Sequence, residues 1–336
     1  MAVPDIGQEA ATVWEAVIPP KQPTDNIFNS RALFFSLAGG GQKGLKTGEG
    51  FAGKESSAGG RQFEFTLEYA VNTNFKAYGQ FAQLDLTRID VFDAARFDIK
   101  TAAGTVDWTD LEIAKCQDAN AKIDILSEKL ENGKDSHINN MNQQLLGVAA
   151  ASADNVLSIQ DIIATNPLVG TVGGIDRSLW SFWRNKQTSG AASVSPFDNL
   201  RASMRSIYNQ SSRGGMVDYP TAILFRRQEF EGYESTLIPN ERFTTADKKN
   251  DGQGAFNNEV LKFKGAECFY DEDLNVANAY FYNPKYLKIV YLKNYWMKMS
   301  DRLEPVNTLT WTQKIRTHWS FCTNQSRRLG VVTSIS

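Results

Sequence analysis

The clearest alternation of apolar and polar residues in the chain runs from residue 61 to residue 69. Every second position there is apolar, at Phe63, Phe65, Leu67 and Tyr69. A period of two is typical of a half-exposed β-strand, because successive side chains of a strand point to opposite faces. A polar stretch at residues 72–74 follows, and residues 75–108, beginning with Phe75, again have an extended character. The pattern predicts a long β-hairpin over residues 58–108. Because isolated two-stranded ribbons are marginally stable in water, we expect the hairpin to lie against a partner chain.

A long helix is predicted directly after the hairpin. Thr109 and Asp110 can cap its N-terminus, and apolar residues recur at helical spacing up to residue 146. At 1.5 Å per residue such a helix would be about 50 Å long. We expect Gly133 to kink it and one face to pack on a sheet.

The N-terminal residues differ from the rest of the chain. Four prolines, the first at Pro4 and the last at Pro23, exclude a long helix and predict an extended arm. A short helix is expected next, capped by one of the polar residues at 24–26, with Ile27, Leu33, Phe34 and Leu37 on its apolar face. A glycine-rich loop then continues to residue 57. Residues 1–57 are therefore expected to form an arm and a loop.

The second half of the chain predicts a mixed core. Residues 220–225 form an apolar run of strand length, and a polar helix is expected from residue 228 to residue 237. Strands are predicted again at residues 260–269, 279–282 and 287–292, and in two C-terminal segments that end near residue 335. The fold class is therefore α+β.

Residues 161–186 connect the polar helical part of the chain to its strand-rich part. Asn166-Pro167 and three glycines are turn residues, because proline fixes its own φ and glycine reaches positive φ without steric cost. The aromatic and cationic residues that follow can anchor this turn against a neighbouring surface. They are Arg177, Trp180, Phe182, Trp183 and Arg184.

Composition and charge narrow the possible functions. The chain has 336 residues, of which 42% are hydrophobic, enough for ordinary cores in about two domains. Its 36 basic and 38 acidic residues leave a formal charge of -2, so no global positive field favours nonspecific DNA binding. We find no secretion signal and no apolar run that could cross a bilayer.

The residues that usually carry chemistry are few and far apart. Three cysteines without a CxxC motif indicate reduced thiols, and two isolated histidines make a zinc site or a Ser-His-Asp or Cys-His mechanism improbable. We expect His137 to be a solvated helix residue and His318 a polar strand residue. Gly48, Gly53 and Lys54 have the spacing of a phosphate-binding loop, but Glu55 stands where Ser or Thr must bind magnesium. No catalytic residue, cofactor or metal is therefore predicted.

Three longer motifs resemble segments of tailed-bacteriophage major capsid proteins of the Hong Kong 97 type. One is GTVGGIDRSLWSFWRN at residues 170–185, and the second is Gly59-Gly60-Arg61 before the alternating strand, with Phe97-Asp98-Ile99-Lys100 on the return. The third is WSFCTNQSRRLGV at residues 319–331. The order of arm, hairpin, long helix, turn-rich insert and C-terminal strands is also similar. The resemblance covers most of residues 59–336.

The resemblance implies a domain organisation. The hairpin at residues 58–108 corresponds to the extended loop, or E-loop, of these proteins, and residues 109–152 and 285–336 to a peripheral domain with a spine helix. Residues 153–284 correspond to an axial domain at the centre of a capsomer. Candidate contacts between subunits are Phe63, Phe65, Tyr69, Phe75, Arg177, Trp180, Trp183 and Arg184.

The function implied is structural, without enzymatic activity. Hexamers and pentamers would form an icosahedral shell around double-stranded phage DNA, without specific DNA binding and without contact with a membrane. Separate scaffolding and portal proteins, and a decoration or cement protein, would be partners. The protein would be made and assembled in the host cytoplasm and reside in the virion. Lys76 and Lys100 lie in the E-loop, but no carboxylate catalyst accompanies them, so crosslinking is not predicted.

Other functions remain open on the sequence alone. An encapsulin-like compartment shell would have the same fold. A soluble enzyme could use a carboxylate pair such as Asp161 and Asp176, or Glu229 and Glu231. Carbohydrate binding by Trp180 and Trp183 is a further alternative.

Overall fold

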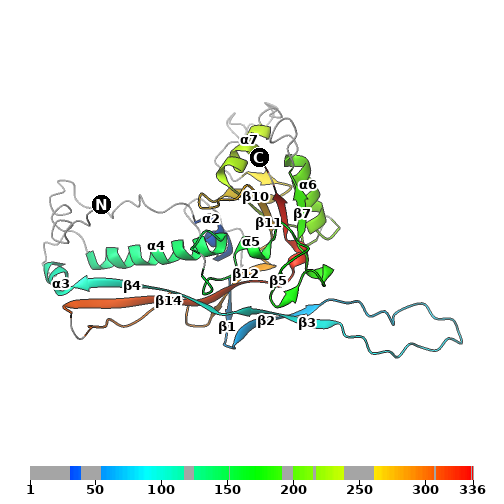
Figure 1. The fold of residues 1–336 in the computed structure, drawn as a ribbon, viewed down its shortest axis with the longest axis horizontal. Coiled ribbons are helices and arrows are strands. Elements are labelled where there is room, and N and C mark those ends of the chain that lie inside the picture. Colours follow the sequence, from blue (N-terminus) through cyan, green and yellow to red (C-terminus); the bar gives the residue numbers. More distant parts are fainter. Residues whose placement is uncertain are drawn as a thin grey trace, which may run out of the picture.

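The computed structural model describes residues 31–38, 54–116, 125–150, 152–190, 200–214, 217–237, 261–305, 308–333 and 335. The chain is elongated, with a flat layer of long strands along one side and a taller α/β unit rising from it (Figure 1). Residues 1–30, which hold the predicted arm and the start of the short helix, and residues 39–53 of the glycine-rich loop lie outside the described residues. The latter include Gly48 and Gly53, which have the spacing of a phosphate-binding loop.

A five-stranded sheet forms the flat layer. Its strands are β1 (Lys54–Ser57), β4 (Lys100–Thr109), β12 (Leu287–Leu292), β13 (Lys298–Met299) and β14 (Thr310–Thr323). The first half of β14 pairs antiparallel with β4, and its second half pairs with β12. The long β14 therefore joins two parts of the sheet that are far apart in the sequence.

Two helices follow β4, where one was predicted. They are α3 (Asp110–Cys116) and α4 (Ile125–Leu146), and residues 117–124 between them are not described. Helix α4 packs on β4 and β14 and continues through Gly133 as one helix (Figure 1). Gly133 lies against Val106 of β4, so its missing side chain serves close packing.

A six-stranded sheet forms the taller unit, in the order β7-β15-β11-β8-β10-β9. Its strands are β7 (Lys186–Ser189), β8 (Ala222–Phe225), β9 (Lys262–Phe263), β10 (Ala266–Tyr270), β11 (Ala279–Tyr282) and β15 (Gly330–Thr333). Helices α6 (Leu200–Ser211) and α7 (Arg227–Leu237) pack against it through one apolar cluster that includes Met204 and Tyr233. The strand predicted at residues 220–225 is fully buried as β8.

Strand pairing places three segments outside the units expected for them. Strand β4 was included in the predicted hairpin at residues 58–108, but it pairs with β14 in the five-stranded sheet. The C-terminal strand β15 pairs with β7 and β11 and so belongs to the six-stranded sheet, although it was assigned to the peripheral domain. Strand β1 was assigned to the N-terminal loop, but it pairs parallel with β12 in the five-stranded sheet. Strand pairing decided these assignments. The partners β7 of β15, β12 of β1 and β14 of β4 each lie more than a hundred residues away in the chain.

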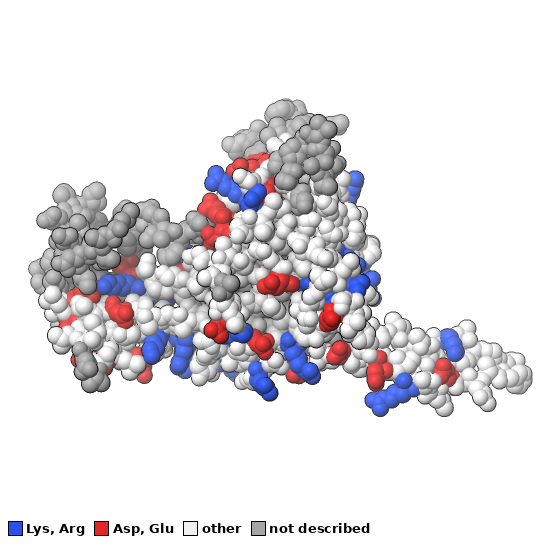
Figure 2. All heavy atoms as spheres, viewed as in Figure 1, with Lys and Arg blue, Asp and Glu red and all other residues white. Residues whose placement is uncertain are grey.

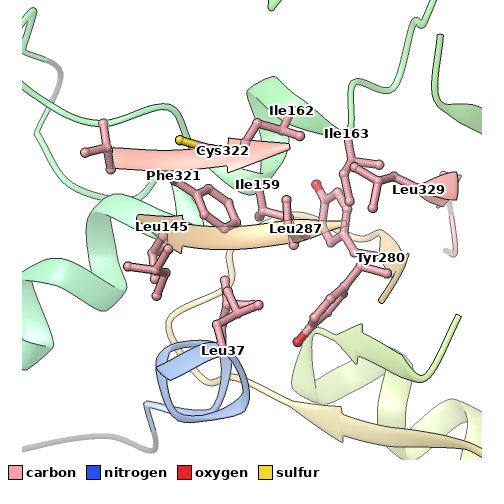
Figure 3. Close-up of a cluster of buried hydrophobic side chains, with 14 of the residues drawn as sticks. Leu37, Leu145, Ile159, Ile162, Ile163, Tyr280, Leu287, Phe321, Cys322 and Leu329 are labelled. Carbon is pink, nitrogen blue, oxygen red and sulfur yellow. The ribbon is translucent and has the colours of Figure 1, made fainter. Parts of the chain in front are cut away.

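The largest core cluster lies where the two sheets meet. Short elements enclose it: α2 (Ala32–Ala38), α5 (Ile159–Ile162), β5 (Thr171–Val172), β6 (Ile175–Asp176) and the 3-10 helices η1 (Ser181–Trp183) and η3 (Ser326–Arg328). Leu37 of α2, Leu145 of α4 and Phe321 of β14 point towards one another in this core (Figure 3). The predicted apolar face of α2 is confirmed at Leu33, Phe34 and Leu37, which are all buried, and Ile27 lies outside the described residues.

Candidate assembly surfaces

The E-loop projects from the body of the chain as a narrow arm (Figure 1). Its strands β2 (Gln62–Glu68) and β3 (Phe92–Asp98) pair antiparallel, and residues 69–91 continue beyond them without regular strands. The predicted strand at residues 61–69 is confirmed, with Phe63 and Leu67 buried on one face. A long hairpin was predicted over residues 58–108, but the strand pairing within it is limited to β2 and β3.

The distal part of the E-loop carries apolar side chains that the chain itself does not cover. Phe81 is 99% exposed and Phe75 87% exposed. Three aliphatic residues share this exposure, namely Val71, Leu84 and Leu86. Large apolar side chains gathered on a projecting segment are typical of a surface that binds another protein.

Polar side chains give the distal loop a defined shape. The Tyr78 hydroxyl donates to the carbonyl of Asn74 at 3.0 Å and accepts from the backbone N–H of Asp85 at 3.1 Å. The Asn74 side chain donates to the carbonyl of Thr87 across the loop at 2.7 Å. These bonds hold the two sides of the loop together, so the apolar residues are presented outward.

The root of the E-loop rests on the turn at residues 170–183. The Tyr69 ring lies 5.6 Å from that of Trp180 and 5.7 Å from that of Phe182, measured between centroids. Gly173 accepts a hydrogen bond from the backbone N–H of Arg96 in β3 at 2.9 Å. It has a positive φ of 60°, and a Cβ there would lie 3.0 Å from the Phe97 ring. The turn therefore fixes the direction in which the E-loop leaves the body.

Arg177 and Arg184 stabilise this turn from within. The buried Arg177 guanidinium donates to the carbonyls of Asp161 and Ile162 in α5. Burial lowers its pKa to about 10, so it remains charged at neutral pH. Arg184 donates to the carbonyls of Arg177 at 2.6 Å and Ser178 at 2.6 Å. Both arginines thus satisfy backbone acceptors of their own chain.

The eight candidate interface residues separate into two groups. Phe63, Arg177 and Trp183 are buried within the subunit, and the Trp183 indole N–H donates to the carbonyl of Val172 at 2.9 Å. An interface role is therefore not proposed for these three side chains. Phe65 and Tyr69 are half-buried and Arg184 is partly covered, whereas Trp180, with 43% of its surface exposed, and Phe75 remain accessible.

A buried polar cluster attaches α2 to the body, and sequence reasoning did not find it. The Asp271 carboxylate accepts from the backbone N–H of Leu33 and from the Asn142 side-chain amide, each at 3.2 Å. Asn142 accepts from the N–H of Phe34 at 3.1 Å. Asp271 and Asn142 are fully buried. No local motif in the sequence marks them, because each acts on a segment at least 108 residues away.

The two histidines and Lys54 contact side chains of their own chain. His137 is 6% exposed and bonds to Thr317 of β14 at 2.9 Å, so the expectation of a solvated residue was wrong. It lies on the side of α4 that faces the sheet. His318 bonds to Thr101 on the neighbouring strand β4, as a polar strand residue. Lys54 places its ammonium 3.8 Å from the centre of the Trp296 ring.

Two features of the described residues bear on other functions. The described part of the chain contains no group of three or more His, Cys, Asp or Glu side chains that could hold a metal ion. Among the described helices, none is long and apolar enough to cross a membrane. The visible face shows acidic and basic side chains interspersed, without a broad basic area (Figure 2).

The fold is similar to that of several solved viral and compartment shells. The capsid protein of cyanophage A-1(L) superposes with a TM-score of 0.61 at 13% identity, covering 94% of this chain and 96% of that chain. The capsid of Myoviridae phage XM1 gives a TM-score of 0.58 at 9% identity, covering 96% and 97%. The SrpI encapsulin of Synechococcus elongatus gives 0.58 at 10% identity, covering 99% and 96%.

No protein-family model and no curated protein matches the chain. The likeness therefore establishes the architecture of the chain, which is the Hong Kong 97-type capsid fold that the sequence motifs predicted. The coverage of both chains is nearly complete, so the whole described chain takes part in this fold.

Proposed function

We propose that this chain is the major capsid protein of a tailed bacteriophage, a structural subunit that assembles into an icosahedral head shell. The observation that carries the proposal is the E-loop, which projects from a capsid fold with Phe75, Phe81 and Leu86 exposed. These side chains have no place in the core of their own chain. A second copy of the chain would cover them.

The exposed apolar area can form a substantial part of a specific contact. An aromatic side chain buries about 150–250 Å² when covered, so Phe75 and Phe81 offer on the order of 400 Å², to which the three aliphatic residues of the distal loop add. A standard protein interface buries about 800 Å² per partner. Burial at about 25 cal/mol per Å² then favours association, before the cost of ordering the partners is subtracted.

The geometry favours repeated contacts of one kind. The E-loop and the opposite end of the flat sheet lie far apart along the longest axis of the molecule (Figure 1). A contact between an E-loop and another part of a second copy joins two different surfaces, and such head-to-tail contacts form rings when the rotation between neighbouring copies closes. Hexamers and pentamers are the rings that build an icosahedral shell. We propose Phe65, Tyr69, Phe75, Trp180 and Arg184 as candidates for these contacts.

The remaining partners follow from the shell function. Scaffolding, portal and decoration or cement proteins would assist assembly in the host cytoplasm, and the finished subunit would be part of the virion. The interspersed charges of the visible face and the formal charge of -2 support enclosure of DNA without specific binding. We propose no enzymatic activity.

An encapsulin-like compartment is the second candidate, and the likeness to the Synechococcus encapsulin over nearly the whole chain favours it. A compartment would enclose a cargo protein, whereas a phage head would enclose DNA. Particles isolated from the natural source separate the two. Nuclease-protected DNA supports the phage head, and a stoichiometric second protein inside the shell supports the compartment.

The experiment that tests assembly uses the purified full chain. Sedimentation velocity and negative-stain micrographs should show closed particles or capsomers, either for the chain alone or after co-expression with a scaffolding protein. A compact monomer under every condition, including co-expression, would contradict the proposal.

A further inference from the structure

Helix α2 is capped by side chains from distant parts of the chain. The first N–H groups of any helix lack partners within the helix. In α2 the N–H of Leu33 donates to Asp271, which follows β10, and the N–H of Phe34 donates to Asn142 of α4. Asn142 also donates to the same oxygen of Asp271. One buried carboxyl group therefore joins α2, α4 and the end of β10.

The same helix bridges the two sheets. The Ser36 hydroxyl lies 2.7 Å from the hydroxyl of Tyr282 in β11 of the six-stranded sheet. Phe34 stacks on Trp296, which follows β12 of the five-stranded sheet. Arg31, immediately before α2, forms an ion pair with Asp135 of α4 at 3.1 Å. Helix α2 thus acts as a strap over the junction where both sheets contribute to the core.

The Asp271 carboxyl is the titratable centre of this attachment. Burial raises its pKa to about 6, against the opposing hydrogen bonds from Leu33, Asn142 and the N–H of Asp273. The nearby Asp273 raises it further. The other ionisable groups facing this region are the buried Tyr282 phenol, whose pKa is also raised by burial, and the Arg31–Asp135 pair.

The sign of the proton effect follows from linkage. When α2 leaves, water reaches the carboxyl and its pKa falls towards the ordinary value of 3.8. The attached state then binds the proton more tightly than the released state, so acid favours attachment and the effect fades as pH rises through 6. The difference between the two pKa values limits the change in the attachment equilibrium to roughly a hundredfold.

We propose that Asp271 makes the attachment of α2 responsive to protons, so that α2 is held most firmly in acid and is released more readily near neutral pH while both sheets stay folded. The strap is the segment that leads from residues 1–30 into the body. Its attachment therefore sets how firmly the N-terminal part of the chain is tied to the core. This inference does not depend on the proposed shell function.

Hydrogen exchange of the full-length protein, followed by mass spectrometry, tests the proposal. Labelling times are scaled to the intrinsic exchange rate at each pH, and residues 310–323 of β14 serve as the internal reference. We expect the protection of residues 31–38, relative to the reference, to fall by about tenfold between pH 5 and pH 7.5. Equal relative protection at the two pH values would overturn the proposal.

Two variants separate the carboxyl of Asp271 from other titrating groups. Asp271→Asn keeps an acceptor for the N–H of Leu33 but cannot titrate, so its relative protection should be independent of pH. Asp135→Asn weakens the contact with Arg31 and should lower protection at both pH values while keeping the tenfold difference. A tenfold difference that persists in Asp271→Asn would refute the role of this carboxyl. If that variant does not fold, the wild-type profile decides, because relative protection must be level above about pH 6 and rise as pH falls below it.

Discussion

Gly133 of α4 and Val106 of β4 approach so closely that a Cβ added to the glycine would lie 2.5 Å from a methyl carbon of the valine. The spine helix therefore crosses the five-stranded sheet with its backbone almost in contact with a strand side chain. Gly133→Ala improves helix propensity by about 1 kcal/mol. Overpacking costs about 1–3 kcal/mol.

We expect the overpacking to prevail, so that Gly133→Ala lowers the free energy of unfolding by about 1 kcal/mol in urea titrations of the unassembled subunit. Gly104→Ala is the matched control. Gly104 lies on the same strand as Val106, and a Cβ there would meet nothing within 4 Å. A Gly133→Ala variant more stable than wild type would show that the sheet yields at this contact.

Trp180 and Trp183 should respond differently to truncation. Trp183 is 1% exposed and donates to Val172, so Trp183→Ala should cost about 3–5 kcal/mol of subunit stability. Trp180 is partly exposed and contacts the E-loop root at Tyr69. Trp180→Ala should leave unfolding within about 1 kcal/mol of wild type. It should also increase protease cleavage within residues 69–91 of the unassembled subunit. Equal losses of stability in both variants would contradict the assignment of Trp183 to the core and of Trp180 to the E-loop root.

The distal E-loop should be needed for assembly and dispensable for folding. Phe81→Asp places a charge on a side chain that is 99% exposed in the subunit, so the free energy of unfolding should change little. A charge buried in a contact between subunits is costly, and assembly measured by sedimentation should therefore fail or need higher protein concentration. Val217→Asp, at a residue 56% exposed on the six-stranded unit, is the control. Normal assembly of Phe81→Asp would place the contact elsewhere.

His137 should make the subunit less stable in mild acid. Burial lowers its pKa from the ordinary value of 6.5, so the unfolded chain binds the proton more readily than the folded chain. The stability contributed by the neutral imidazole is therefore present above pH 6.5 and is lost as pH falls below it. The raised pKa of Asp271 has the opposite effect on stability in the same pH range. The effect is therefore measured as the difference between wild type and His137→Asn.

The unfolding free energy of wild type should fall relative to that of His137→Asn as pH decreases from 7 to 5. The amide of Asn can bond to Thr317 but does not titrate in this range. A difference that is constant with pH would mean that the imidazole reaches water in the folded subunit.

Cys268 and Cys322 should be unreactive in the folded subunit. Both are buried, and burial raises the pKa of each thiol to about 12. The thiolate is the reactive form, so alkylation at pH 8 should leave both residues unmodified within hours. Both should react fully in urea. Peptide mass spectrometry identifies each site, and rapid labelling of either one under native conditions would reveal local opening of its sheet.

The elements whose pattern is local could be predicted from the amino-acid sequence. The alternation from Phe63 to Leu67 defines β2, the apolar run at residues 222–225 defines β8, and the apolar face of α2 follows from the spacing of Leu33 and Leu37. Each pattern reflects one strand or helix that turns one side to the core. The motifs at residues 59–61, 170–185 and 319–331 then indicated the capsid fold.

The sheets that β1 and β15 join could not be predicted in this way, because strand partners depend on packing between distant segments. The same holds for individual side chains. Arg177 and Trp183 have the composition of a binding surface, but the fold buries them, and His137 turns towards β14. Asp271 and Asn142 have no local signal at all, since their partners in α2 come from the other end of the chain. Burial and long-range hydrogen bonds depend on what the whole chain places around a residue, and a local pattern does not contain that information.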